Sequence, residues 1–130
     1  KEAFLRDLDF LVLAMPMTPA NLGIVGEREL RCLPSHAYLL NPARGPLVQE
    51  DALMRALGEG WIAGAALDAL ATEPLPKDNP LWTLPNVFIT PHIGGYCDTY
   101  VLDAAKQFEQ NLAALAAGMP EKMINREKRV

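Results

Sequence analysis

Short apolar runs alternate with segments of helical periodicity along this 130-residue chain. Mainly apolar runs occupy residues 9–14, 37–41, 62–67 and 87–90. Continuous apolar runs of this length are typical of parallel strands that are covered on both faces. Proline follows three of them closely, which favours a loop at the strand end. The pattern therefore predicts four strands.

Helical periodicity appears between and after these runs. Residues 26–30 predict a short surface helix, and residues 50–57 predict a longer one whose apolar side chains share one face. A long helix is expected over residues 98–118, ended by a glycine and a proline. An apolar stripe recurs along it, and we predict that this stripe is core: Val101, Ala105, Phe108, Leu112 and Leu115.

The order of strands and helices predicts the fold class. Strands that alternate with helices indicate an α/β protein with a parallel sheet and flanking helices. In such a sheet, ligands bind outside the carboxyl ends of the strands. Polar residues that follow the predicted strands are therefore candidates for a functional site.

Three such residues are Arg44, Glu73 and His92. Arginine holds a planar carboxylate through two parallel hydrogen bonds, and histidine transfers a proton near neutral pH. A glutamate beside the histidine would orient its ring. Each of the three alone is more typical of a solvated or structural side chain. As a set at one sheet edge, they suit proton-coupled chemistry on a small acid.

Composition and charge limit the partners. A net charge of −4 and a pI near 5.1 argue against a nucleic-acid surface. No apolar run is long enough to span a bilayer, so we expect no membrane partner. Cys32 and Cys97 lack metal-type spacing, so no metal site is expected. With no secretory leader visible, we expect a reducing cytoplasm.

A phosphate-binding glycine turn is expected between a strand and a helix of a dinucleotide fold. Residues 58–63 match the glycine spacing, but they follow a helix and precede a strand. That context cannot direct a helix N-terminus at a pyrophosphate, so we interpret the segment as a turn.

The chain nevertheless resembles one family. Matching motifs lie in order along most of the chain, and any one alone is weak. The motifs are Met15-Pro16-Met17-Thr18-Pro19, Leu40-Asn41-Pro42-Ala43-Arg44-Gly45, Gly64-Ala65-Ala66-Leu67-Asp68, Glu73-Pro74-Leu75-Pro76, Asn79-Pro80-Leu81 and His92-Ile93-Gly94-Gly95. Together they resemble the second half of the Rossmann-like NAD-binding domain of the D-isomer-specific 2-hydroxyacid dehydrogenases. We expect residues 1–118 to form this partial dinucleotide-binding domain, and 119–130 to be an exit segment toward a substrate domain.

The resemblance implies an oxidoreductase that transfers a hydride between NAD or NADP and a small 2-oxo or 2-hydroxy acid, of glyoxylate/hydroxypyruvate or phosphoglycerate type. Arg44 would bind the substrate carboxylate, His92 would be the acid–base group, and Glu73 would pair with it. Asp68 would contact the nicotinamide carboxamide. The remaining cofactor contacts would come from Met15 and Pro16 near the adenine, and from Pro42, Ala43, Gly94 and Gly95 around the nicotinamide. Family members are commonly dimers, so a homodimer is expected.

A second hypothesis comes from a different class. The glycine-rich first half of the nucleotide domain and the substrate domain are absent from this sequence, so we expect the chain alone to be inactive. The alternative is therefore a non-catalytic nucleotide-sensing or dimerisation fragment.

Overall fold

The computed structural model describes residues 1–124, which form two compact units. The first unit is Lys1–Gly94, and the second begins at Gly95. The expected boundary after residue 118 stays a prediction, and residues 125–130 of the expected exit segment lie outside the described part of the chain.

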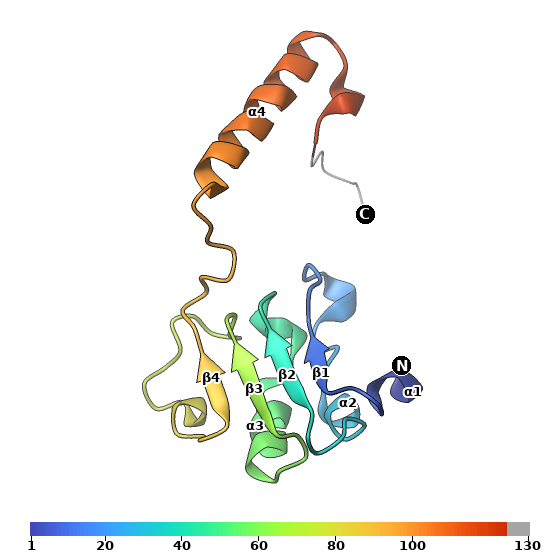
Figure 1. The fold of residues 1–130 in the computed structure, drawn as a ribbon, viewed down its shortest axis with the longest axis vertical. Coiled ribbons are helices and arrows are strands. Elements are labelled where there is room, and N and C mark those ends of the chain that lie inside the picture. Colours follow the sequence, from blue (N-terminus) through green and yellow to red (C-terminus); the bar gives the residue numbers. More distant parts are fainter. Residues whose placement is uncertain (125–130) are drawn as a thin grey trace. The chain divides into compact units, whose positions relative to one another are not determined.

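The first unit is built on a four-stranded parallel sheet (Figure 1). Its strands follow the chain order, β1 (Phe10–Val12), β2 (Tyr38–Asn41), β3 (Gly64–Leu67) and β4 (Val87–Ile89). The register places Leu39 of β2 between Leu11 of β1 and Ala65 of β3. All four predicted strands and the α/β class are therefore confirmed.

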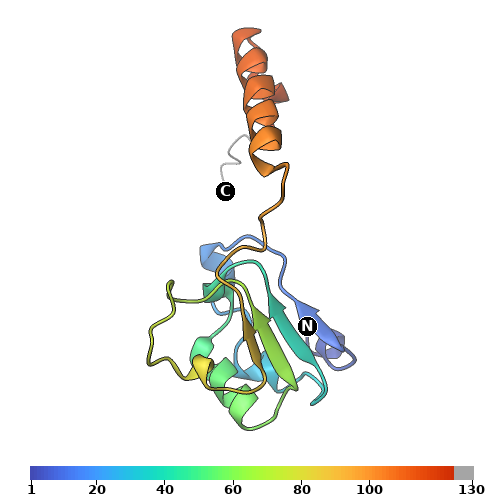
Figure 2. The same ribbon diagram turned by 60° about the vertical axis from the view of Figure 1, so that its left-hand side comes forward.

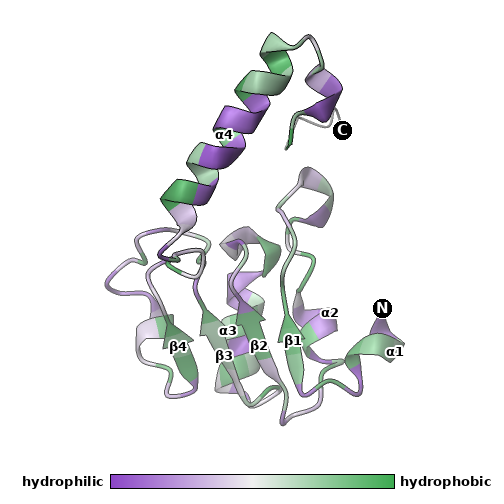
Figure 3. Ribbon diagram, turned by 45° about the horizontal axis from the view of Figure 1, so that its top comes forward, coloured by the Kyte–Doolittle hydropathy of each residue, from purple (hydrophilic) through white to green (hydrophobic). Residues whose placement is uncertain are grey.

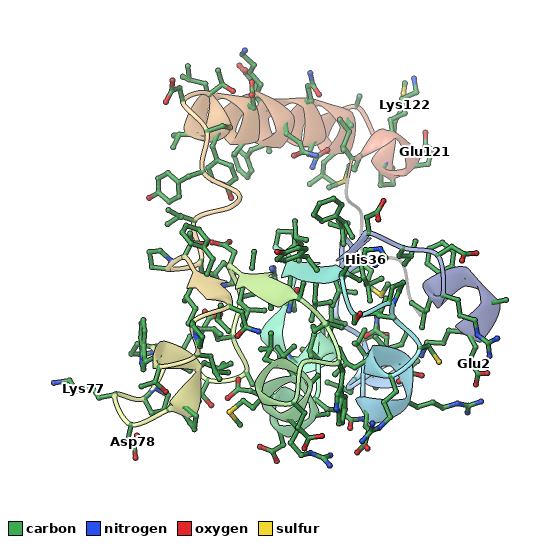
Figure 4. All side chains as sticks on the ribbon, turned by 60° about the horizontal axis from the view of Figure 1, so that its bottom comes forward. Glu2, His36, Lys77, Asp78, Glu121 and Lys122 are labelled. Atoms are coloured by element: carbon green, nitrogen blue, oxygen red, sulfur yellow. The ribbon has the colours of Figure 1, made fainter. Side chains whose placement is uncertain are left out.

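The helices of this unit are short. They are α1 (Glu2–Leu5), α2 (Glu27–Leu30) and α3 (Glu50–Gly58), with 3-10 turns η1 (Pro19–Asn21), η2 (Gly45–Leu47) and η3 (Pro80–Trp82). Acidic residues in the first turn of α3 complement the helix dipole. Helices α2 and α3 lie on the same face of the sheet (Figures 2 and 4). The buried core lies between them and the strands, and its fully buried side chains include Leu30, Leu39, Leu53 and Ile62.

No element of the first unit covers the opposite face of the sheet. Side chains of successive strand positions point to opposite faces, so the same strands that bury Leu11 and Leu39 expose other apolar residues. Phe10, Tyr38 and Phe88 are all exposed, and the rings of Phe10 and Tyr38 stack with their centroids 6.0 Å apart. Within Lys1–Gly94 the strands are therefore covered on one face only, not on both faces as expected. Helices α2 and α3 supply only one covering layer.

The second unit consists of α4 (Tyr100–Ala116) and the 3-10 turn η4 (Pro120–Lys122). Gly118 follows α4 with φ of +69°, a conformation that favours glycine and that ends the helix. The Asn111 amide bonds the backbone of Ile124 in both directions, at 2.9 Å and 2.7 Å, which holds the segment after η4 beside α4.

The predicted stripe on α4 is not buried within the second unit. Val101, Phe108, Leu112 and Leu115 are all more than half exposed. Figure 3 shows apolar and polar residues mixed along α4. Helical periodicity indicates which face of a helix is apolar, but it does not indicate what covers that face. No second layer within residues 95–124 buries that face. None of the helices in residues 1–124 has the length and apolar character needed to cross a membrane.

Candidate functional site

The side chains of His92 and Glu73 form a hydrogen-bonded pair. His92 Nδ1 lies 2.8 Å from Glu73 Oε2, and the backbone N–H of Leu70 donates to Glu73 Oε1 at 2.8 Å. The Leu70 hydrogen bond, followed by that of His92, holds the pKa of Glu73 below its usual value. Glu73 is therefore an acceptor near neutral pH, and His92 Nδ1 must carry the shared proton. This leaves His92 Nε2 as the ring nitrogen that can exchange a proton with a ligand.

Asp68 lies at the carboxyl end of β3 and contacts the turn that carries His92. Its Oδ1 accepts hydrogen bonds from Thr90 Oγ1 at 2.5 Å and from the Ile93 N–H at 2.9 Å. Its Oδ2 accepts from the Gly94 N–H at 2.7 Å. The Thr90 hydroxyl, with these two backbone donors and the nearby His92, holds the pKa of Asp68 below its usual value, although burial opposes this. Asp68 is one of two buried polar side chains in the described core, the other being Asn41.

Asn41 organises the loop that carries Arg44. Its Nδ2 donates to the Arg44 carbonyl at 2.9 Å, and its Oδ1 accepts from the Ala43 N–H at 3.2 Å. The Arg44 guanidinium is exposed and donates to the Ala43 carbonyl at 2.6 Å. An exposed, weakly engaged guanidinium remains able to bind an incoming carboxylate.

Gly45 brings the Arg44 loop against the loop that leads to Glu73. It is buried, and a Cβ added there would lie 1.9 Å from the Leu70 carbonyl carbon and 2.3 Å from the Ala71 nitrogen. Only glycine allows the two backbones to approach so closely. The two loops are therefore in direct contact, although no hydrogen bond is seen between the Arg44 side chain and Glu73 or His92.

A hollow of about 390 Å³ borders the His92–Glu73 pair. Its walls are largely apolar and include Leu75, Trp82 and Ile89. The Trp82 indole N–H donates to the Pro76 carbonyl at 2.9 Å, which fixes this ring as a wall. An apolar pocket with a few polar groups at its edge is the usual form of a small-molecule site.

The structure brings some of the predicted residues together and separates others. Asp68, Glu73, His92 and Gly94 form one connected group. Pro42, Ala43 and Arg44 lie on the neighbouring loop after β2, and Met15 and Pro16 lie exposed beyond β1. Gly95 belongs to the second unit, so its relation to this group stays a prediction. No group of three or more His, Cys, Asp or Glu side chains in residues 1–124 could hold a metal ion.

Two residues of this site were not predicted. Asn41 ends the predicted strand over residues 37–41, and an asparagine before a proline is a common signal for a side-chain-capped turn. Thr90 ends the predicted strand over residues 87–90. Its hydrogen bond to Asp68 spans 22 residues, and no local pattern indicates a contact at that separation.

The comparison with known proteins agrees with this geometry. Residues 1–94 match the family described as D-isomer specific 2-hydroxyacid dehydrogenase, NAD binding domain. The chain is 39% identical over 127 residues to a glyoxylate reductase of Thermofilum pendens, which covers 97% of the chain and 38% of that relative. It is 40% identical over 125 residues to glyoxylate/hydroxypyruvate reductase B of Yersinia enterocolitica, which covers 95% of the chain and 38% of that relative.

A solved structure shares the fold. The crystal structure of a D-isomer specific 2-hydroxyacid dehydrogenase from Xanthobacter autotrophicus Py2, in complex with NADPH and MES, superposes with a TM-score of 0.89 at 38% identity. The match covers 98% of this chain and 51% of that one. The chain therefore spans about two fifths of the length of the curated relatives described above.

Proposed function

The chain belongs to the D-isomer-specific 2-hydroxyacid dehydrogenase family, and we propose that it provides the acid–base half of a reductase active site for small 2-oxo acids. The observation on which this proposal rests is the His92–Glu73 hydrogen bond at the carboxyl edge of the sheet. That pair leaves His92 Nε2 available to a ligand. The exposed Arg44 lies on the loop after β2, the strand that pairs with β3. The proposed substrates are glyoxylate and hydroxypyruvate, the substrates named for the two relatives.

The residues present fit a nicotinamide cofactor. The proposed cofactor-facing loops after β1, β2 and β4 expose Pro16, Pro42 and Gly94 at the carboxyl edge, where dinucleotides bind open parallel sheets. Gly94 has no side chain to fill that edge, and the Asp68 carboxylate lies directly behind it. We propose NAD or NADP as the cofactor, which would supply the hydride when bound.

The proposed mechanism assigns one task to each side chain. Arg44 binds the substrate carboxylate and stabilises negative charge that develops on the 2-oxo oxygen. His92 Nε2 donates a proton to that oxygen, and Glu73 stabilises the imidazolium and holds the ring in place. In the reverse direction, His92 removes the proton of the 2-hydroxyl group.

The test is a chimera in which this chain replaces the matching 127-residue segment of the Thermofilum pendens glyoxylate reductase. Absorbance of NADH or NADPH at about 340 nm then reports turnover of glyoxylate and hydroxypyruvate. We expect His92→Ala to lower kcat by roughly 100- to 10,000-fold, the usual contribution of general acid–base catalysis. Arg44→Ala should raise KM and lower kcat as well.

The matched control is His36→Ala. His36 is exposed and lies 3.1 Å from Asp9, near the start of β1 rather than at the carboxyl edge. Its replacement should leave turnover unchanged. A folded, cofactor-binding chimera that keeps its turnover after His92→Ala would show that the proposed function is wrong.

A second candidate is a non-catalytic association module, and the observation that favours it is exposed apolar surface. Phe10, Phe88 and Phe108 are each at least 60% exposed. Large exposed apolar patches mark association sites. We therefore propose that another subunit covers these phenylalanines, most simply in a homodimer. Titration with NADH by nicotinamide fluorescence separates the candidates: saturable micromolar binding supports the enzyme, and self-association without binding supports the module.

Both free cysteines, Cys32 and Cys97, fit our proposal of a cytoplasmic location.

A further inference from the structure

We propose that Asp68 is a positioning residue for His92, whose carboxylate holds the turn of residues 90–94 in the one conformation that presents the imidazole to Glu73. The contacts that support this are intrinsic to the chain and involve no cofactor. The functional meaning of the positioning rests on the proposed acid–base role of His92.

The hydrogen bonds of Asp68 lie on both sides of His92. Thr90 precedes His92 by two residues, and Ile93 and Gly94 follow it directly. All three donate to the Asp68 carboxylate, two to Oδ1 and one to Oδ2. The backbone on both sides of His92 is therefore held by a single side chain on the neighbouring strand, 22 to 26 residues away in the sequence.

His92 itself has an unusual backbone conformation. Its φ is +54°, which places it among non-glycine residues in the left-handed region. Such residues persist only where the surroundings determine their conformation. A local hydrogen bond runs from the His92 N–H to the Thr90 carbonyl, at 3.0 Å. The Asp68 hydrogen bonds on either side restrain the turn further.

The Asp68 carboxylate suits the donors that surround it. Asp68 is buried, and its lowered pKa keeps it ionised near neutral pH, so both oxygens act only as acceptors. The groups that face it are a hydroxyl and two backbone N–H donors. A Cβ at Gly94 would lie 2.8 Å from Oδ2, so the turn also lacks room for a side chain there. An asparagine would turn an NH₂ group toward at least one of these donors and lose that bond.

Asp68 therefore differs from a residue that only contacts the nicotinamide. Three donors already occupy the carboxylate, and one acceptor position remains for a cofactor amide. A positioning role is visible without cofactor, whereas a pure cofactor contact would have no effect on the free chain. This difference makes the inference testable on the chain as it exists.

The experiment compares ¹⁵N-labelled wild-type chain with Asp68→Asn by NMR. The readouts are the hydrogen-exchange rates of the Ile93 and Gly94 amides and the tautomer of the His92 ring, measured where histidine is neutral. We expect wild type to hold the proton on Nδ1. In Asp68→Asn the two amides should exchange about 10- to 100-fold faster, as for loss of a hydrogen bond to a charged group, and His92 should become a mixture of tautomers.

Two internal comparisons make the result specific. His36, the other histidine, pairs with Asp9 and should keep its ring signals. Asp78→Asn is the matched control, since Asp78 is exposed and points away from the unit in Figure 4. A folded Asp68→Asn whose His92 tautomer and two amide rates stay as in wild type would overturn the inference.

A second variant decides the matter if Asp68→Asn does not fold. Thr90→Val removes one donor and keeps the carboxylate. The Ile93 amide shares Oδ1 with Thr90, so its exchange rate should change. The His92 ring should shift toward a mixture of tautomers, as in Asp68→Asn. Unchanged signals in this variant would count against the inference. Because no substrate or cofactor is used, an inactive chimera would leave this result standing, and a tautomer shift would not by itself support turnover.

Discussion

The contact at Gly45 leads to the prediction that the structure specifies most sharply. Replacing Gly45 by alanine adds a Cβ that would lie 1.9 Å from the Leu70 carbonyl carbon and 2.1 Å from its oxygen. This is roughly 1.6 Å closer than an ordinary carbon–carbon contact of about 3.5 Å. The obstructing atoms are backbone, so no side-chain rotation can relieve the overlap, and one of the two loops must move.

The expected cost follows from this displacement. Overpacking in a closely packed interior typically costs about 1–3 kcal/mol, and a clash with backbone falls at the upper end of that range. A loss of about 3 kcal/mol in a unit of this size corresponds to a fall in Tm of roughly 12–24 °C. The same movement separates the Arg44 loop from the Glu73 loop, so turnover of the chimera should fall as well.

The control is Gly58→Ala. A Cβ at Gly58, the last residue of α3, meets no atom within 4 Å, and its φ is not positive. Both substitutions reduce the freedom of the unfolded chain equally, so their difference isolates the steric term. Gly58→Ala should leave Tm unchanged or raise it by a few degrees, because alanine is favoured over glycine in a helix by up to about 1 kcal/mol.

Thermal unfolding followed by tryptophan fluorescence is the appropriate assay. Trp61 and Trp82 are the two tryptophans of the chain, and both lie in the first unit, so the signal reports on that unit alone. The reasoning would be refuted if Gly45→Ala unfolded at the wild-type temperature, or if both variants lost the same stability.

Three further predictions concern the same unit. Asn41→Ala should lower the urea midpoint by the equivalent of about 1–3 kcal/mol, because the Ala43 N–H and the Arg44 carbonyl lose their partner in a partly buried loop; an unchanged midpoint would contradict this. Leu39→Ala should cost about 2–5 kcal/mol in urea unfolding, because this side chain is fully buried in the central strands, and a loss below about 1 kcal/mol would count against the described core. The pKa of Asp68 is lowered, first by the Thr90 hydroxyl, so its carboxylate stabilises the folded state at pH values above the ordinary pKa of 3.8. This contribution is lost as the pH falls through the lowered pKa of the folded state. Tm should therefore fall less steeply with acid in Asp68→Asn than in wild type.

Much of the architecture follows from local sequence. The runs that became β1 to β4 are apolar and short, and α3 carries its apolar residues at helical spacing, so each element can be predicted without its neighbours. The rule that parallel strands present their carboxyl ends at one edge then predicts that Glu73 and His92 lie near each other. In the structure the two side chains are hydrogen-bonded at 2.8 Å, in line with strand order and loop length bringing them close.

Other features depend on distances that no local pattern encodes. The apolar stripe of α4 indicates a face that favours burial, but periodicity does not say what covers it, and Phe108 and Leu112 are exposed in the described residues. The sequence likewise determines that Gly45 is small and that Asp68 ends a strand. Only tertiary packing decides that Gly45 admits the Leu70 backbone and that Asp68 bonds both sides of His92, because these contacts join segments 22 to 26 residues apart whose separation is set by how the sheet and its loops pack.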